Sequence, residues 1–113
     1  EAQEALFLCR HYLLEPKLAV AYRRRAFFGA FEHDLRITFD TRVQYDARAL
    51  DIRRRFETGK YLLPADICVL EIKFNHGVPT WLVELIGRHD LRAVRFSKYC
   101  RAVDLEFFHS RFT

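Results

Sequence analysis

The clearest strand signal in the chain lies in residues 67–74, which read ICVLEIKF. Successive side chains of an extended strand point to opposite faces of a sheet. Glu71 and Lys73 therefore share one face with Ile67 and Val69. The other face is apolar, with Cys68, Leu70, Ile72 and Phe74. The pattern predicts a strand with a packed face and a charged face.

Two more strands are expected upstream, in residues 18–28 (LAVAYRRRAFF) and 35–39 (LRITF). The polar turn between them predicts an antiparallel hairpin. Alternation places Arg24 on the opposite face from Arg23 and Arg25. It also places Arg36 on the same face as Asp40, to which Arg36 could form a salt bridge.

Three helices are expected around these strands. Helical spacing of apolar residues predicts them in residues 2–14, 79–89 and 98–108. Ser97 can cap the last helix, and the second should bury Trp81, Leu82, Leu85 and Ile86. Residues 46–57 are expected to form a short helix or an exposed connection, and residues 59–66 hold turn residues. The predicted fold class is α+β, an antiparallel sheet with flanking helices.

The aromatic side chains are expected to pack between the sheet and the helices: Phe27, Phe28, Phe31, Phe39, Phe74, Phe96 and Trp81. The three cysteines are widely spaced and form no metal-ligand pattern. We expect free thiols in a reducing compartment, with Cys68 and Cys100 as small core residues.

The charge of the chain is basic, with 19 Lys and Arg against 15 Asp and Glu, and 15 of the cations are Arg. Arginine is favoured where a planar donor must bind phosphate or carboxylate in a bidentate way. A GC-rich genome would also raise the share of arginine. Composition alone therefore makes a phosphate-rich partner plausible without selecting it.

Charges within the predicted strands give two interpretations, which stay open at this point. Arg24, Arg36, Glu71 and Lys73 could lie on a face open to water, or they could line an enclosed, water-filled tunnel. A tunnel lined with cations would bind a polyanion such as a chain of phosphates. Glu71 would repel phosphate unless it held a divalent metal that bridges to phosphate oxygens.

Four motifs give the chain a family resemblance. Residues 22–27 (YRRRAF) resemble the Y-x-R-x-A-[FY] strand of VTC domains, the catalytic domains of the vacuolar transporter chaperone complex. Residues 35–40 (LRITFD) resemble their l-R-v-T-f-D strand. Residues 70–74 (LEIKF), followed by 78–82 (VPTWL), are similar to their l-E-[IV]-K-[FY] … l-P-x-W-[LM] segment. Residues 96–100 (FSKYC) resemble their F-S-K-Y box, and the order matches that of the family.

The resemblance implies a triphosphate tunnel metalloenzyme fold, related to CYTH domains, in which antiparallel strands form a barrel around a basic tunnel. It implies metal-dependent phosphoryl transfer, in which polyphosphate is built from the terminal phosphate of ATP. The carried-over catalytic residues are Lys73 and Lys98. The phosphate-binding residues are Arg24, Arg36, Lys73, Lys98 and, as an alternative to helix capping, Ser97. Glu71 would bind Mn²⁺ or Mg²⁺.

The resemblance covers only part of the family's domain, because the motifs of its N-terminal half are not found here. We therefore expect residues 1–113 to be a single-domain fragment, the C-terminal half of a VTC-like domain. The missing half, or another copy of the chain, would complete the tunnel. Whether residues 1–113 alone are active is left undecided by the sequence.

Three alternatives to the polymerase interpretation remain. The same tunnel could serve an inorganic triphosphatase, or a non-catalytic module that binds polyphosphate or nucleotide. A nucleic-acid-binding domain is the least supported, since neither an RNP-like nor a helix-turn-helix pattern is present. The expected partners are ATP, polyphosphate or triphosphate, with no nucleic acid. No membrane segment is recognised in residues 1–113, and a cytoplasmic location is expected.

Overall fold

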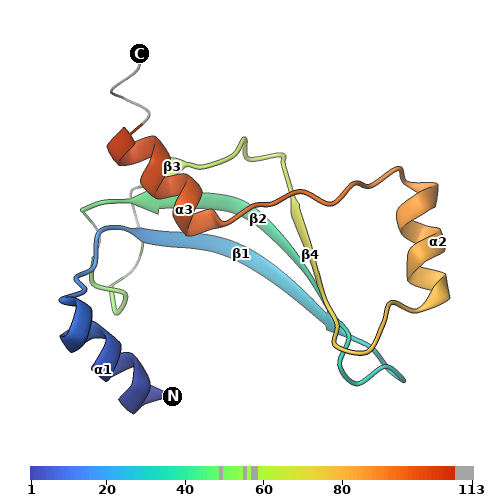
Figure 1. Cartoon of the computed structure of the whole chain (residues 1–113). Helices are drawn as coiled ribbons and strands as arrows, with labels where there is room; N and C mark the ends of the chain where they lie inside the picture. The colour runs from blue at the N-terminus through green and yellow to red at the C-terminus, as the bar shows by residue number, and fades with distance from the viewer. Residues whose placement is uncertain (49, 55, 57–58, 109–113) are drawn as a thin grey trace.

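The computed structural model describes residues 1–48, 50–54, 56 and 59–108. The elements occur in the order α1 (Ala2–Tyr12), β1 (Ala19–Phe28), β2 (Arg36–Asp46), β3 (Lys60–Tyr61), β4 (Val69–Lys73), α2 (Thr80–Arg88), α3 (Lys98–Val103) and a π-helical turn, η1 (Asp104–Phe108). This mixture of helices and antiparallel strands confirms the α+β class (Figure 1).

Strand β2 is the centre of the sheet. It pairs with β1 along one edge, and its other edge pairs with β4 near the start and β3 near the end. All of these pairings are antiparallel. The sheet is open, so the closed barrel expected from the resemblance is not formed by the described residues (Figure 1).

Strand β2 is longer than residues 35–39 because it continues past an irregularity. The pairing shifts between Ala21 and Arg23 of β1, where one residue of β1 faces two of β2. Arg42 has a left-handed φ of 51°, as expected at a β-bulge. The bulge breaks the alternation of side chains and hides the rest of the strand from a pattern search.

The segment between β2 and β4 forms a connection with one short strand. Within residues 46–57, the described part consists of turns and irregular backbone, which selects the connection over the short helix. Positions 49, 55 and 57 of that prediction lie outside the described residues. Lys60 and Tyr61, predicted as turn residues, form β3 because they pair with Tyr45 and Gln44 of β2.

The main core lies at the β3 end of the sheet. It contains Leu18, Val43, Tyr45, Leu62 and Ala102, and Phe96 packs against it. Ala102 is fully buried, so the core fixes α3 on the sheet. The start of α3 is thereby held against β1 and β2.

Helix α2 lies beyond β4 at the other end of the sheet (Figure 1). Its predicted apolar stripe is only partly confirmed, because Leu82 is buried and Ile86 half-buried, while Trp81 and Leu85 are exposed. A hollow of about 470 Å³ separates α2 from the outer face of the hairpin. In the described structure the helix therefore covers this face incompletely.

Other packing predictions are also wrong. Phe27, Phe28 and Phe31 are 54%, 71% and 89% exposed, and Cys68 and Cys100 are exposed too.

The predicted first helix is confirmed as α1, which ends where Leu13 takes a left-handed conformation. No described helix combines the length and apolar character that a membrane crossing requires.

Candidate functional site

Strand register brings the predicted site residues of the strands to one face of the sheet. Side chains directly opposite each other in antiparallel strands share a face. Three rows therefore run across β1, β2 and β4: Arg24, Asp40 and Val69; Ala26, Thr38 and Glu71; Phe28, Arg36 and Lys73. We call this the polar face. It confirms the prediction that Arg24, Arg36, Glu71 and Lys73 lie on one side of the sheet.

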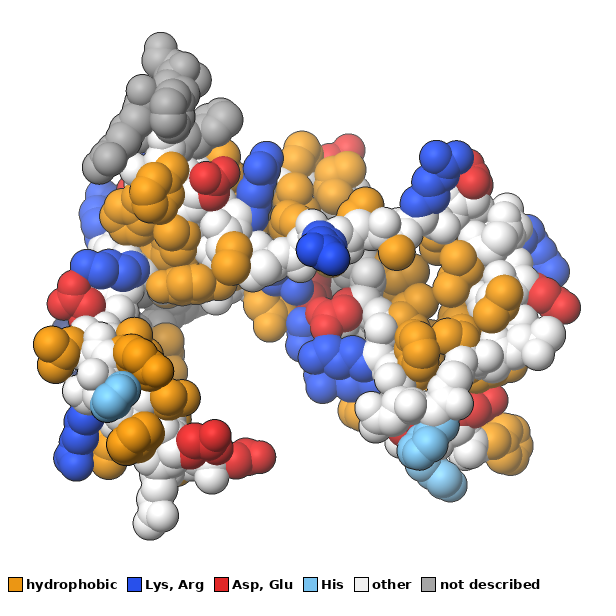
Figure 2. Space-filling model, in the orientation of Figure 1, with side chains coloured by type: hydrophobic (Ala, Val, Ile, Leu, Met, Phe, Trp, Pro, Cys, Tyr) orange, Lys and Arg blue, Asp and Glu red, His pale blue; other side chains and the backbone are white. Residues whose placement is uncertain are grey.

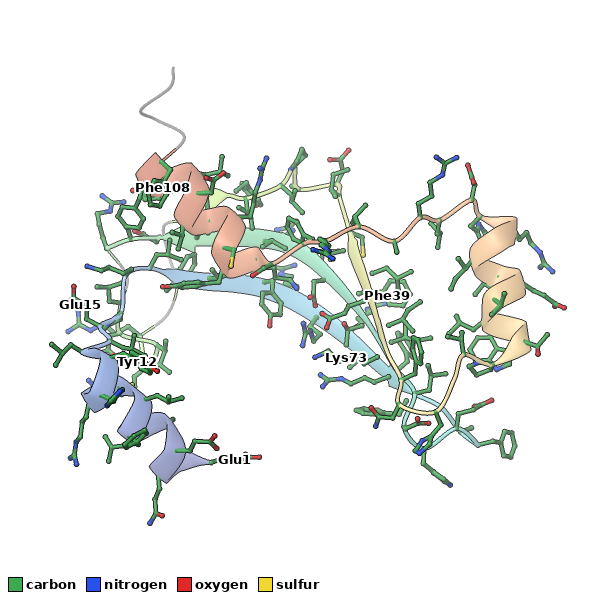
Figure 3. The ribbon with its side chains drawn as sticks, viewed as in Figure 1. Glu1, Tyr12, Glu15, Phe39, Lys73 and Phe108 are labelled. Carbon is green, nitrogen blue, oxygen red and sulfur yellow. The ribbon has the colours of Figure 1, made fainter. Side chains whose placement is uncertain are left out.

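The figures show the same separation of charge from apolar surface. Lys73 and Phe39 point to opposite sides of the sheet, with Phe39 on the side of α2 (Figure 3). Basic and acidic side chains gather in the middle of the molecule on the concave side (Figure 2). Apolar side chains gather between the sheet and α2.

A buried carboxylate organises one end of the polar face. Asp40 has no exposed side-chain surface. It accepts hydrogen bonds from Nε and Nη2 of Arg24 at 2.7 and 2.8 Å, and its Oδ2 lies 2.7 Å from Nζ of Lys98. The hydrogen bonds from Arg24, followed by those from Lys98, lower the pKa of Asp40, although burial opposes them. The predicted Asp40–Arg36 salt bridge is therefore wrong, since Asp40 is held by Arg24 and Lys98.

Tyr22 lies beside the same two cations. The guanidinium carbon of Arg24 is 4.8 Å from the centre of the Tyr22 ring, and Nζ of Lys98 is 4.9 Å from it. Both distances fall within the range of cation–π contacts. Tyr22 is the first residue of the Y-x-R motif, so the motif itself was a signal for this residue. The sequence analysis placed Tyr22 on the same face as Arg24 but assigned it no role.

The other end of the polar face contains polar groups that are buried without a partner. Nε of Arg36 and Oγ1 of Thr38 are buried, and neither has a hydrogen-bond partner among the described residues. Nζ of Lys73 lies 3.2 Å from Oε1 of Glu71. These side chains and Arg24 line a hollow of about 10 Å³, roughly the space of one water molecule. The sequence analysis gave Thr38 no role, although Thr38 occupies the threonine position of the l-R-v-T-f-D motif.

A larger hollow adjoins this end of the polar face. It has a volume of about 580 Å³, and Arg36, Lys73 and Phe28 contribute to its lining. Oδ2 of Asp34 accepts hydrogen bonds at its rim from the backbone N–H groups of Asn75 and His76, at 2.8 and 2.9 Å. These bonds tie the β1–β2 turn to the loop after β4.

Ser97 and Lys98 lie at the start of α3. Oγ of Ser97 accepts a hydrogen bond from the backbone N–H of Cys100 at 3.2 Å, which confirms the capping role. A phosphate contact of Ser97 stays a prediction. Lys98 is brought to the polar face through Asp40, so the site combines strand residues with a residue from the C-terminal helix.

The carboxylates of the polar face differ in their freedom to bind a metal. Asp40 is fully engaged by two cations, whereas the side chain of Glu71 is 38% exposed and faces Lys73. Within residues 1–48, 50–54, 56 and 59–108, no group of three or more His, Cys, Asp or Glu side chains could hold a metal. The binding of Mg²⁺ or Mn²⁺ at Glu71 stays a prediction.

Comparison with known proteins places this arrangement in a family. No curated protein and no solved structure matches the chain significantly. A family model described as the VTC domain matches residues 1–107. This match covers the polar face, Lys98 and the core that holds α3. The chain belongs to the VTC domain family.

Proposed function

We propose that this domain binds a triphosphate or polyphosphate chain along its polar face and transfers a phosphoryl group with the help of Mn²⁺ or Mg²⁺. Membership of the VTC family indicates a polyphosphate-related function. The observation that carries the proposal is the row arrangement, which gathers Arg24, Arg36 and Lys73 around Glu71 on one face. The buried, unpartnered Nε of Arg36 supports it, because such a donor is costly without a ligand.

The cations of the polar face are distributed over two rows that a chain of phosphates could follow. Arg24 lies in the first row, and Arg36 and Lys73 lie in the third. Four residues of an extended strand span about 13 Å. A linear chain of several phosphates can lie along both rows, and the side chains of Arg24, Arg36 and Lys73 converge on one small hollow between them. The middle row, with Thr38 and Glu71, would face the centre of that chain.

The proposed roles follow from charge. Arg24 and Arg36 bind phosphate oxygens, and Ser97 is a further candidate donor. Lys73 and Lys98 neutralise the charge that shifts between phosphates during transfer, which is the main catalytic task in this chemistry. Glu71 holds the divalent ion, which when bound would draw negative charge from the phosphate oxygens.

A binding experiment with inorganic tripolyphosphate tests this proposal. The thermal stability of the purified protein is measured with tripolyphosphate, with and without Mn²⁺, for wild type, Arg36→Ala and Glu71→Gln. A ligand specific for the native state adds about 2.7 kcal/mol of stability at a hundredfold excess over its dissociation constant. We expect Arg36→Ala to abolish the shift and Glu71→Gln to remove only its Mn²⁺-dependent part.

The control is Arg53→Ala, because it removes the same charge from a side chain that is 87% exposed and does not belong to the polar face. This variant should keep the full shift. Equal losses in Arg36→Ala and Arg53→Ala would show that any arginine contributes through net charge, and would overturn the proposed site. So would a well-folded wild-type protein without a shift.

Turnover separates the polymerase from the triphosphatase and from the module that only binds. With ATP and Mn²⁺, a polymerase lengthens polyphosphate, whereas a triphosphatase releases phosphate from tripolyphosphate. A module that only binds shows neither product, and Glu71→Gln leaves its affinity unchanged or higher, since a negative charge is removed. We expect polymer formation by wild type and none by Glu71→Gln.

A further inference from the structure

We propose that Asp40 and Tyr22 are positioning residues that hold Arg24 and Lys98 in a fixed geometry on the polar face. This inference rests on the proposed function for its catalytic consequence, but the geometry itself can be tested without a substrate. Asp40 and Tyr22 are not themselves expected to touch phosphate. We call the four side chains Tyr22, Arg24, Asp40 and Lys98 the clamp.

The bonding of Asp40 leaves donors of both cations free. Asp40 takes Nε and Nη2 of Arg24 in a bidentate pair, with both distances below 3 Å. A guanidinium carries five N–H donors, so those of Nη1 remain for a ligand. Lys98 has three donors and spends one on Asp40. The carboxylate fixes both cations and still leaves N–H groups for phosphate oxygens.

Burial makes the clamp rigid. The side chain of Asp40 is 0% exposed, that of Lys98 is 15% exposed and that of Arg24 is 29% exposed. Two long side chains lose rotamer freedom before a ligand arrives. The Tyr22 ring contacts both cations and restricts them further. A ligand would then meet cations that are already ordered.

The position of Lys98 indicates that its contact with Asp40 does not serve to stabilise α3. Lys98 is the first residue of the helix, where the helix dipole disfavours a positive charge. Its ammonium group points to Asp40 of the sheet instead. A charge that is unfavourable in its own helix and is compensated by a residue from a distant element is typical of a functional site.

The clamp matters most for the transition state. Removing the Asp40 charge makes the site more positive, so ground-state attraction of a polyanion should not fall. The orientation of Arg24 and Lys98 would be lost, and a small misplacement of a catalytic group lowers the rate strongly. Positioning therefore predicts a lower kcat without a higher KM.

The first experiment uses the ligand-free protein. The Nε–H signal of Arg24, assigned by its loss in Arg24→Lys, is followed by NMR in exchange with water. We expect Asp40→Asn to speed this exchange by about tenfold or more, because a charge-assisted hydrogen bond is lost. The matched control is Asp51→Asn, since Asp51 forms the same bidentate pair with the exposed Arg53. It should leave the Arg24 signal unchanged, and an Asp40→Asn protein with wild-type exchange at Arg24 would overturn the proposal.

The second experiment measures turnover of tripolyphosphate or ATP. We expect Asp40→Asn to lower kcat by about 10- to 100-fold with KM within about threefold of wild type. Leu82→Ala is the stability control, because Leu82 is buried at the other end of the sheet. A fall in kcat that only tracks the folded fraction in both variants would show a structural role and overturn the proposal.

Tyr22 provides a second variant in case Asp40→Asn does not fold. Tyr22→Leu removes the ring but no charge, and we expect faster Arg24 exchange and a kcat lowered by about three- to tenfold. Tyr22→Phe keeps the ring and should restore both values, whereas equal effects of the two substitutions would contradict the role of the ring. If wild type neither binds nor turns over tripolyphosphate, the proposed function fails, and the exchange of Arg24 still decides the clamp.

Discussion

Arg24 and Arg36 carry the same charge on the same face but lie in opposite surroundings. Arg24 is paired with a buried carboxylate at two of its nitrogens. Arg36 has a buried Nε without a partner among the described residues, and its guanidinium lies 5.7 Å from the Phe28 ring. The two arginines should therefore contribute to folding with opposite sign.

Substituting each arginine by methionine tests this contrast. Arg36→Met removes an unsatisfied buried donor, and we expect the ligand-free protein to gain about 1 kcal/mol of unfolding free energy. Arg24→Met leaves Asp40 with Lys98 alone, and we expect a loss of about 3 kcal/mol. Urea denaturation of both variants measures the difference. A larger loss in Arg36→Met than in Arg24→Met would mean that the partners are assigned wrongly.

Asp34 is a second single residue with a testable effect, because its carboxyl should make the stability of the protein depend on pH. Hydrogen bonds from the Asn75 backbone, followed by those from the His76 side chain, lower the Asp34 pKa from 3.8 to about 2. A carboxyl whose pKa falls on folding stabilises the native state above its unfolded pKa, and this contribution is lost as the pH falls through the folded pKa. We expect the unfolding free energy to be level above about pH 5 and to fall between about pH 4 and pH 2.

Asp34→Asn isolates this effect, because asparagine does not titrate. Its unfolding free energy should fall less steeply between pH 4 and pH 2 than that of wild type, measured by urea denaturation at each pH. Asp51→Asn is a useful comparison, since the pKa of Asp51 is also lowered, but by Arg53 on an exposed segment. Wild-type steepness in Asp34→Asn would show that Asp34 does not drive the acid loss.

At the scale of elements, α3 links the main core to the polar face. Ala102 packs in the core, and Lys98 one turn earlier reaches Asp40. Ser97 caps the helix through the N–H of Cys100. A change at the cap should therefore affect both the stability of α3 and the placement of Lys98.

Ser97 can be divided into its two candidate roles by substitution. Ser97→Ala removes the cap, and we expect it to cost about 1 kcal/mol of unfolding free energy. Ser97→Asn keeps a capping oxygen and should retain near wild-type stability, but it removes the hydroxyl. Tripolyphosphate affinity measured by calorimetry then reports on the phosphate contact. Wild-type affinity in Ser97→Asn would exclude the hydroxyl as a ligand, whatever the effect on stability.

For the whole molecule, the sequence predicted the local geometry of single strands better than it predicted whether the sheet closes into a barrel. The register between the strands brings Arg24, Arg36, Glu71 and Lys73 to one face. Alternation correctly grouped the residues of each single strand, because the side-chain period of a strand is fixed by its backbone. It could not locate the bulge at Arg42, whose left-handed φ depends on the pairing partner. The partners of Asp40 also depend on register and on the docking of α3, which are not local properties.

Exposure was predicted least well, because it depends on what covers each layer. Phe27 and Phe28 have the composition of packing residues, yet both are exposed on the open sheet. The outer edge of β1 has no strand partner among the described residues, and such an edge is open to pairing with another strand. The expected completion of the tunnel by a missing half or another copy stays a prediction.

The separation of buried residues between the two ends of the sheet leads to a final prediction about cooperativity. Val43 is 1% exposed in the main core, and Leu82 is 2% exposed in α2. We expect Val43→Ala and Leu82→Ala to cost about 2 and about 3 kcal/mol of unfolding free energy. If the ends open separately, only Val43→Ala should speed hydrogen exchange of the amides in α3 under native conditions, because the core that holds this helix is weakened.

The outcome bears on how the site is kept in place. Amide exchange in α3 that responds to Val43→Ala alone would mean that Lys98 is held by a local unit of structure formed by β2, β3 and α3. Equal acceleration by Leu82→Ala would mean that both ends unfold together, and the separation would be refuted. If exchange in α3 responds to Val43→Ala alone, the polar face is stabilised from the end of the sheet where α3 packs. Substitutions near α2 should then change the free energy of unfolding of the protein while the contacts of Arg24, Asp40 and Lys98 persist.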